Sequence, residues 1–185
     1  MNSKEYFEAT ANLDMSLIYK KFRDQIPMGC MILDAGCGVG RDTRYFISHG
    51  YKTVSIDASE EMVNFCRRYP FAFCEKMSFD ELPYVEEFNA VWACASLVHL
   101  SSTELRSALR SLAMALKTHG TLYFSLKQVA VGTVDSGRYF YPIVESDILD
   151  FLEKQLHMKL IERWVNQSQV QGRLDSWSNY LLNKR

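Results

Sequence analysis

No stretch of the chain approaches the roughly twenty consecutive apolar residues that a membrane-spanning helix needs. The first residues are polar, and Lys4, Glu5 and Glu8 interrupt any apolar run, so the pattern of a secretory leader is missing as well. These absences disfavour membrane and secreted classes. We therefore expect a cytoplasmic protein.

An excess of charge of one sign is also missing. The chain has 21 Lys and Arg residues against 22 Asp and Glu residues, a formal net charge of −1, and no long run of either sign. A general attraction to nucleic acid or to an anionic membrane has no electrostatic basis in such a chain. We expect a small-molecule partner, and the sequence leaves open whether the protein is a monomer or a homodimer.

Metal-ligand and disulfide spacings are missing too. The five cysteines are odd in number and contain no C-x-x-C pair. Four of them fall within or beside predicted strands or a glycine-rich loop, where a free thiol acts as a small apolar side chain, which suits a reducing compartment. The histidines lie far apart, so no metal site is predicted. The cysteines are Cys30, Cys37, Cys66, Cys74 and Cys94, and the histidines are His49, His99, His119 and His157.

The most informative stretch runs from Met31 to Gly40. A short apolar run meets three closely spaced glycines there, and residues 41–49 have helix-compatible side chains closed by Gly50. This order predicts strand, tight loop and helix. Glycines let a ligand approach the main chain, and free N–H groups at the helix start offer donors and a partial positive charge. The stretch therefore predicts a ligand site.

The spacing of the glycines bears on the kind of ligand. A dinucleotide fingerprint has glycine at its first, third and sixth positions, but the sixth position counted from Gly36 is Arg41. The carboxylate of Asp34 would repel a pyrophosphate and attract an ammonium or sulfonium group. Asp57 lies 21 positions after Gly36, near the offset at which a carboxylate binds ribose hydroxyls. A cationic nucleoside fits this pattern better than a dinucleotide does.

These residues belong to a longer series of motifs that resembles one family. The series consists of Leu33-Asp34-Ala35-Gly36-Cys37-Gly38-Val39-Gly40, Ser55-Ile56-Asp57-Ala58-Ser59 with Met62, Val91-Trp92-Ala93-Cys94-Ala95-Ser96-Leu97-Val98-His99-Leu100, and Leu116-Lys117-Thr118-His119-Gly120-Thr121-Leu122. It resembles the class I S-adenosylmethionine (SAM)-dependent methyltransferases. Their turn is usually L-K-P-G-G, so Thr118 and His119 depart from that pattern.

The resemblance implies an α/β, Rossmann-like sheet of seven strands, five parallel strands plus a C-terminal antiparallel hairpin, with helices on both faces. The polar loop at 166–175 is too short for a helical crossover, which independently favours the hairpin. We expect a single methyltransferase domain over residues 1–185. An N-terminal helical lid would occupy 1–27, and the sheet core 28–185.

The remaining predicted elements follow from periodicity and caps. Ser59 should cap a helix that ends before Pro70, a Ser101 capping box should open a helix running to about Leu116, and Ser146 should open another. Strands are predicted at 52–56, 71–74, 89–94, 121–126, 159–165 and 177–182.

The same resemblance implies a cofactor site for SAM, with S-adenosylhomocysteine as the product. The main chain at Gly36, Cys37 and Gly38 would lie beside the methionine moiety, with Asp34 near its ammonium group. Asp57 would bind the ribose, and Met62 and Met77 would flank the adenine. The full set of expected cofactor-binding residues is Asp34, Gly36, Cys37, Gly38, Arg41, Asp57, Ala58, Met62, Met77, Ser78 and Ala93.

Two residues are candidates for catalysis. His99 follows the fourth predicted strand and has an imidazole that titrates near neutrality, although a structural hydrogen bond is its alternative role. Arg138, together with Arg173, would hold an anionic group of the acceptor. The alternative for each arginine is an ion pair with a carboxylate such as Asp135 or Asp175.

The segments Gly137-Arg138-Tyr139-Phe140, Gly172-Arg173 and Trp177-Ser178-Asn179 resemble a subgroup of small bacterial, tellurite-resistance-like methyltransferases. The expected function is SAM-dependent methyl transfer to a small molecule. Two alternatives stay open: an NAD(P)-type nucleotide-binding oxidoreductase, and a non-catalytic SAM-binding module.

Overall fold

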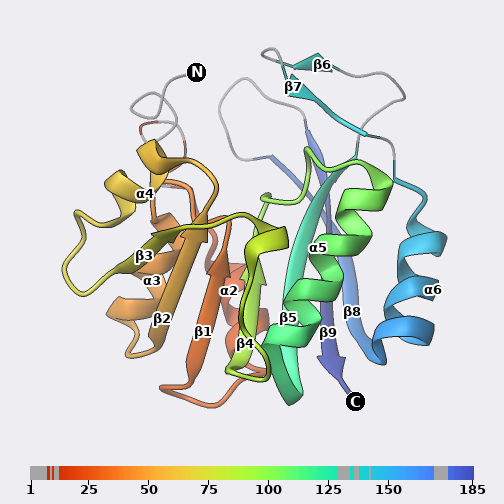
Figure 1. Ribbon diagram of the computed structural model, residues 1–185, viewed down its shortest axis with the longest axis horizontal. Coiled ribbons are helices and arrows are strands. Elements are labelled where there is room, and N and C mark those ends of the chain that lie inside the picture. Colours follow the sequence, from red (N-terminus) through yellow and green to blue (C-terminus); the bar gives the residue numbers. More distant parts are fainter. Residues whose placement is uncertain are drawn as a thin grey trace.

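Seven strands form one mixed sheet in the order β3-β2-β1-β4-β5-β9-β8 (Figure 1). The computed structural model describes residues 8, 10, 13–128, 134, 135, 138–141, 143–168 and 175–185, and at 134, 135, 138 and 139 it describes the main chain alone. The strands of the sheet are β1 (Met31–Ala35), β2 (Lys52–Asp57), β3 (Phe73–Lys76), β4 (Phe88–Ala93), β5 (Leu116–Gln128), β8 (Met158–Gln167) and β9 (Ser176–Lys184).

The first five strands are parallel, whereas β9 is antiparallel to both β5 and β8. The predicted sheet of five parallel strands and a C-terminal hairpin is therefore confirmed. Because β1, β2 and β4 run in the same direction, their carboxyl ends meet at one edge, where open α/β sheets bind ligands.

Helices cover both faces of the sheet, as Figure 1 shows for α5 on the near face and α2 behind it. Alternate residues of β4 point to opposite sides: Ala90 and Trp92 pack with α2 and α3, whereas Val91 and Ala93 pack with α5 and α6. The helices are α2 (Ser16–Arg23), α3 (Arg41–Ser48), α4 (Glu60–Cys66), α5 (Ser102–Ala115) and α6 (Glu145–Leu156), with a short 3-10 turn η1 (Phe79–Glu81).

The helix caps agree in part with the sequence. Ser101 and Glu104 form the predicted capping box of α5, and Ser59 Oγ accepts the N–H of Met62 at the start of α4. The α4 helix ends at Cys66, earlier than expected, and α6 begins after Val144 rather than at Ser146.

The largest departure concerns the expected turn at 116–120. This segment lies within β5, where the register with β4 shifts between Phe88 and Ala90 and His119 has a φ of 64°. A second, two-stranded sheet of β6 (Val134–Asp135) and β7 (Arg138–Tyr139) was not predicted. Strands of two residues carry too little periodicity to be found in a sequence.

The N-terminal segment contributes to the core. Tyr19 and Phe22 of α2 are buried and pack with Trp92 and Tyr123 from the sheet. Most of the segment before α2 lies outside the described residues, so a lid over 1–27 stays a prediction. Among the described residues, no helix is both long enough and apolar enough to cross a membrane.

Candidate functional site

The turn after β1 brings bare main chain close to the segment that follows β4. Gly36 and Gly40 both have a φ of 82°, in the left-handed region that glycine adopts without strain. A Cβ added to Gly36 would lie 2.2 Å from the Cβ of Ser96. Glycine is required at position 36 both by the conformation and by this contact.

The N–H groups of the turn are already used within the chain. Gly36 and Cys37 donate to the carbonyl of Ile56 at 2.8 and 2.9 Å, and Gly38 donates to Asp57 Oδ2 at 2.9 Å. The N–H groups of these three residues are therefore not free donors. A ligand at the turn would instead meet the Cα surfaces and carbonyl groups of the glycines.

Asp57 connects the glycine turn to the start of α4. Its Oδ2 accepts the N–H of Gly38, its Oδ1 accepts the N–H of Ser59 at 2.9 Å, and its carbonyl accepts the N–H of Met77 at 3.1 Å. These bonds fix the orientation of a half-buried carboxylate. Each carboxylate oxygen has a second lone pair, so the group can accept the two hydroxyls of a ribose.

Asp34 lies beneath the turn and is 1% exposed. Thr43 donates its hydroxyl to Asp34 Oδ2 at 2.6 Å. Burial, reinforced by the negative charge of Asp42, raises the pKa of Asp34 to about 8. A cation bound nearby would stabilise the ionised form of this carboxyl group.

Asp42, in the first turn of α3, is the centre of a buried polar network. Its carboxylate accepts Tyr19 Oη at 2.5 Å, Trp92 Nε1 at 2.8 Å, and Arg41 Nε and Nη2 at 2.6 and 2.8 Å. Burial opposes the charge, but Arg41 and the other donors outweigh it and hold the pKa of Asp42 below its ordinary value. Arg41 Nη2 also lies 3.5 Å from the sulfur of Cys94, just after β4.

The sequence did not reveal this network. An adjacent Arg-Asp pair directly after a glycine turn is a visible signal, but the donors Tyr19 and Trp92 come from distant segments. Nor did any pattern point to Ser96, whose Oγ is buried and has no hydrogen-bond partner within the described part of the chain.

The other expected cofactor residues are placed around the turn. Met62 and Met77 are partly buried, and Met77 packs against the main core cluster. Ala58 is exposed, whereas Ala93 is fully buried on the α5 side. The hydroxyl of Ser78 donates its proton to Glu81 in the capping box of η1. This proton is therefore not available for a hydrogen bond to a ligand.

A second group of side chains lies beyond the ends of β4 and β5. The ring of His99 is 4.7 Å from the ring of Phe140, and Lys127 Nζ lies 4.5 Å from the centre of the same ring. Lys127, only 6% exposed, forms an ion pair with Asp175 at 3.0 Å. Arg138 is described in its main chain only, paired with Asp135, and Arg173 lies outside the described residues.

The cysteines correct one expectation. Cys66 and Cys74 form a disulfide, so they are not the free thiols that the sequence suggested. Cys30, Cys37 and Cys94 are free. Burial, together with the charges of Asp34 and Asp57, raises the pKa of the Cys37 thiol.

The site fits SAM better than a dinucleotide. The Gly36 main chain lies against Ser96, whose Oγ is buried, and the Asp57 carboxylate is held in place by the N–H of Gly38 in the same turn. A pyrophosphate would need N–H donors that Gly36, Cys37 and Gly38 have already used, and it would face the carboxylate of Asp57. The residues present therefore fit a cationic nucleoside cofactor.

The sheet order and the glycine turn define a class I, Rossmann-like methyltransferase fold. Residues 32–120 match the family model described as "Methyltransferase domain". This match spans slightly less than half of the chain.

Curated relatives share part of their length with the chain. It is 28% identical over 103 residues, 53% of this chain and 45% of the relative, to magnesium-protoporphyrin O-methyltransferase from Rhodobacter capsulatus. It is 30% identical over 115 residues, 58% of this chain and 43% of the relative, to malonyl-[acyl-carrier protein] O-methyltransferase from Erwinia pyrifoliae. The chain thus spans less than half the length of these relatives.

A solved structure shows the same fold over nearly the whole chain. It is the 1,6-didemethyltoxoflavin-N1-methyltransferase of Burkholderia thailandensis, with bound 1,6-didemethyltoxoflavin and S-adenosylhomocysteine. The TM-score is 0.77 at 17% identity, covering 97% of this chain and 80% of that one.

Proposed function

We propose that this chain transfers a methyl group from SAM to a small-molecule acceptor. The observation that carries the proposal is the carboxylate of Asp57, bound to Gly38 and Ser59 at the edge of a glycine turn. It is supported by the match of residues 32–120 to the methyltransferase domain family.

In this proposal each expected residue has a definite task. Asp57 accepts hydrogen bonds from the ribose hydroxyls of SAM, and Asp34, beneath the turn, attracts the ammonium group of its methionine moiety. Arg41, whose guanidinium reaches Cys94 at the end of β4, is placed to attract a carboxylate. The remaining proposed contacts are the glycine turn at Gly36, Cys37 and Gly38, the adenine neighbours Met62, Met77 and Ser78, and Ala58 and Ala93.

Bound SAM supplies a methyl group that is already activated by the positive sulfur. The chain then has to orient the acceptor in line with this group and exclude water. We propose that His99 and Phe140 form one wall of the acceptor site, because their rings are in contact beyond the end of β4. His99 also provides a base if the attacking atom carries a proton.

We propose an anionic acceptor. Lys127 has an ammonium group beside Phe140 that is shielded from water and paired with Asp175, so an acceptor anion would share or replace that carboxylate. Arg138 is proposed as a second cation for the acceptor. The likeness to small bacterial, tellurite-resistance-like methyltransferases and a cytoplasmic location are further proposals, and they rest on the sequence motifs and on the absence of a long apolar run.

Isothermal calorimetry with S-adenosylhomocysteine and with NAD tests the cofactor. We expect binding of the first and none of the second. Asp57→Asn should weaken binding by about 10- to 100-fold, since hydrogen bonds to a charged group contribute about 1.5–3 kcal/mol. Asp150→Asn, on the exposed face of α6, should leave the affinity unchanged. Unchanged affinity in Asp57→Asn would refute the ribose assignment, and binding of NAD alone would favour the oxidoreductase.

A panel of small acceptors with radiolabelled methyl donor separates an enzyme from an inert binding module. Methyl transfer to a panel member supports the proposal. For that acceptor, His99→Gln should lower kcat at an unchanged KM if the imidazole acts as a base, and should raise KM if it only forms the wall.

A further inference from the structure

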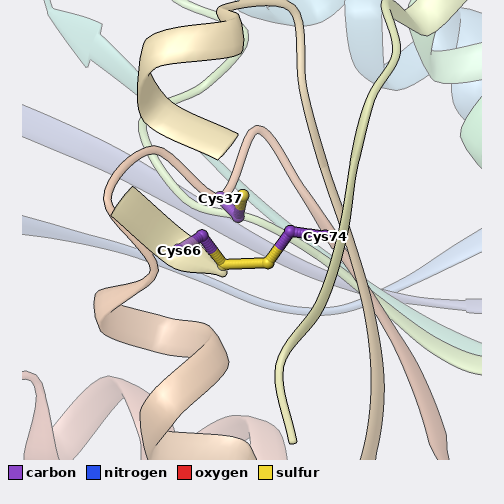
Figure 2. A group of neighbouring side chains, drawn as sticks. All are labelled: Cys37, Cys66 and Cys74. Carbon is purple, nitrogen blue, oxygen red and sulfur yellow. A yellow bond between two sulfur atoms is a disulfide. The ribbon is translucent and has the colours of Figure 1, made fainter. Parts of the chain in front are cut away.

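Three cysteine side chains converge beneath the glycine turn (Figure 2). Cys37 belongs to the turn itself, Cys66 is the last residue of α4, and Cys74 lies in β3. All three sulfur atoms lie within 4.8 Å of one another, and each residue is at most 8% exposed. Residues far apart in the chain thus form one buried sulfur cluster.

The largest separation between the sulfur atoms is close to the limit for a metal site. Two thiolates bound to one Zn²⁺ ion at about 2.3 Å are at most about 4.6 Å apart, and about 3.8 Å apart in tetrahedral geometry. The separations within the cluster reach 4.8 Å at most. Small side-chain rotations are therefore enough to bring three sulfurs onto one ion once they are all thiols.

The surroundings favour a thiophilic cation. Val63 and Ala72 pack against the cysteines, and two neutral oxygen atoms lie nearby: the Thr43 hydroxyl is 3.6 Å from Cys66 Sγ, and the Gly38 carbonyl is 3.6 Å from Cys37 Sγ. The carboxylate of Asp57 acts electrostatically on Cys37, and its negative charge attracts a cation. Thiolate ligands select soft or borderline ions such as Cu⁺ and Zn²⁺.

We propose that Cys37, Cys66 and Cys74 form, in the reduced protein, a three-thiolate site for one thiophilic metal ion of the Zn²⁺ or Cu⁺ type. The site would join the glycine turn, the end of α4 and β3 through a single ion. Its metal chemistry uses neither SAM nor an acceptor, although Cys37 is also one of the proposed cofactor contacts.

The cluster changes between two chemical states. In the structure Cys66 and Cys74 are joined as a disulfide. A dithiol reductant supplies two electrons and two protons, which yields two thiols while the reductant becomes a disulfide. The metal ion then displaces the thiol protons into solvent, and no group is oxidised in that step.

Metal titration of the reduced protein tests the proposal. The protein is reduced with a dithiol, freed of reductant under anaerobic conditions, and titrated with Zn²⁺ against a chromophoric chelator and, separately, with Cu⁺ against a Cu⁺ chelator. We expect one equivalent to bind for at least one ion, and the comparison identifies which. The oxidised protein should bind much more weakly, since only Cys37 remains as a thiol. Equal binding by both forms, or no binding of either ion by the reduced form, would overturn the proposal.

Single substitutions identify the ligands. Cys37→Ser, Cys66→Ser and Cys74→Ser should each lower the affinity by at least about tenfold, because even the partners of metal ligands cost 10- to 100-fold when removed. Cys30→Ser, a buried cysteine outside the cluster, is the matched control and should bind like the wild type. Unchanged affinity in Cys37→Ser argues decisively against a three-sulfur site.

One measurement does not depend on variants that fold. X-ray absorption of the metal-loaded wild type should report three sulfur neighbours, at about 2.3 Å for Zn²⁺. A first shell of nitrogen and oxygen, or of two sulfurs at most, would exclude the site. Calorimetry with S-adenosylhomocysteine on the same sample keeps the result separate from the cofactor assignment.

Discussion

At the scale of single residues, Asp34 is a buried carboxyl group that we propose lies near the ammonium group of SAM. It is held by the Thr43 hydroxyl and is shielded from water. Its neutral form is favoured in the free protein, whereas a bound cation favours the ionised form. In the proposed site, the ionisation of this carboxyl group therefore affects both the stability of the fold and the affinity for SAM, and it makes both depend on pH.

Replacing Asp34 by Asn should flatten the dependence of stability on pH. The pKa of Asp34 is about 8 in the folded chain against an ordinary value of 3.8 for an aspartate, so the folded state binds more protons between these values. Its contribution to the free energy of unfolding is full below about pH 4 and is lost as the pH rises to about 8. Asn keeps an oxygen for Thr43 but cannot ionise, so Asp34→Asn should gain stability relative to the wild type across that window.

Urea unfolding at several pH values measures this effect, and calorimetry on the same samples measures its counterpart. The affinity of the wild type for SAM should rise as Asp34 ionises, and Asp34→Asn should lose both that rise and part of the affinity. Parallel stability curves for the two proteins would contradict the raised pKa.

Single residues also show what a sequence can reveal of a site. The place of Asp57 beside the glycine turn was predictable because its offset follows from strand and loop lengths, and its binding of ribose stays a prediction. The Asp42 network was not, because a buried carboxylate must find donors but nothing local specifies Tyr19 or Trp92. The disulfide of Cys66 and Cys74 was missed for the same reason: eight residues of separation match no motif, and the proximity arises from β3 lying beside α4.

At the scale of elements, β5 contains a residue in a conformation that favours glycine. His119 has a φ of 64° at the position of the first glycine in the family's L-K-P-G-G turn. Its carbonyl accepts Asn183 Nδ2 at 2.8 Å, which ties this irregularity to β9. The side chain itself is exposed, so its replacement tests the backbone alone.

His119→Gly should raise the free energy of unfolding by up to about 1 kcal/mol. A left-handed conformation costs an L-residue roughly 1–2 kcal/mol, and the greater freedom of unfolded glycine offsets about 0.4–1 kcal/mol of the gain. Denaturant unfolding gives the value. His119→Ala retains a Cβ and should show no gain; equal stabilisation by both would rule out the conformational explanation.

The α2 helix is attached to α3 by a hydrogen bond and to the sheet by apolar packing. Tyr19→Phe removes the hydroxyl that donates to the buried Asp42 carboxylate. We expect a loss of about 1.5–3 kcal/mol, the usual range for a bond to a charged group. Tyr84→Phe removes a hydroxyl from the half-exposed carboxylate of Glu75 and should cost less than about 1 kcal/mol. Thermal melts of both variants decide, and equal losses would contradict a buried charge at Asp42.

Elements were predictable where local signals are strong. The Ser101 capping box marks the start of α5. Short apolar runs mark β1, β2 and β4. Boundaries were less accurate where tertiary pairing extends a strand: β5 begins at Leu116 because Leu116 pairs with Phe88, although a turn was expected there. The strands β6 and β7 have two residues each, which is too short for an alternation of apolar and polar residues to be recognised in the sequence.

At the scale of the whole molecule, the sheet divides the proposed reaction between two sets of strands. The cofactor residues come from the ends of β1, β2 and β3, and the acceptor wall comes from segments after β4, β5 and β7. Because the two groups meet only in the folded chain, a ligand of the site binds the native state and not the unfolded one. Ligand binding must then stabilise the entire domain.

This linkage gives a prediction with a magnitude. At 100 times its Kd, S-adenosylhomocysteine should add about 2.7 kcal/mol to the free energy of unfolding. At about 2–4 °C per kcal/mol for a chain of this size, the Tm should rise by about 5–11 °C and continue to rise with the logarithm of concentration. Scanning calorimetry across a concentration series measures the rise, with NAD as the control that should leave Tm unchanged.

In Asp57→Asn the same curve should shift to 10- to 100-fold higher concentration, about as far as the calorimetric affinity falls, because both measurements report one site. A rise in Tm that is indifferent to Asp57 would place the nucleoside elsewhere on the molecule.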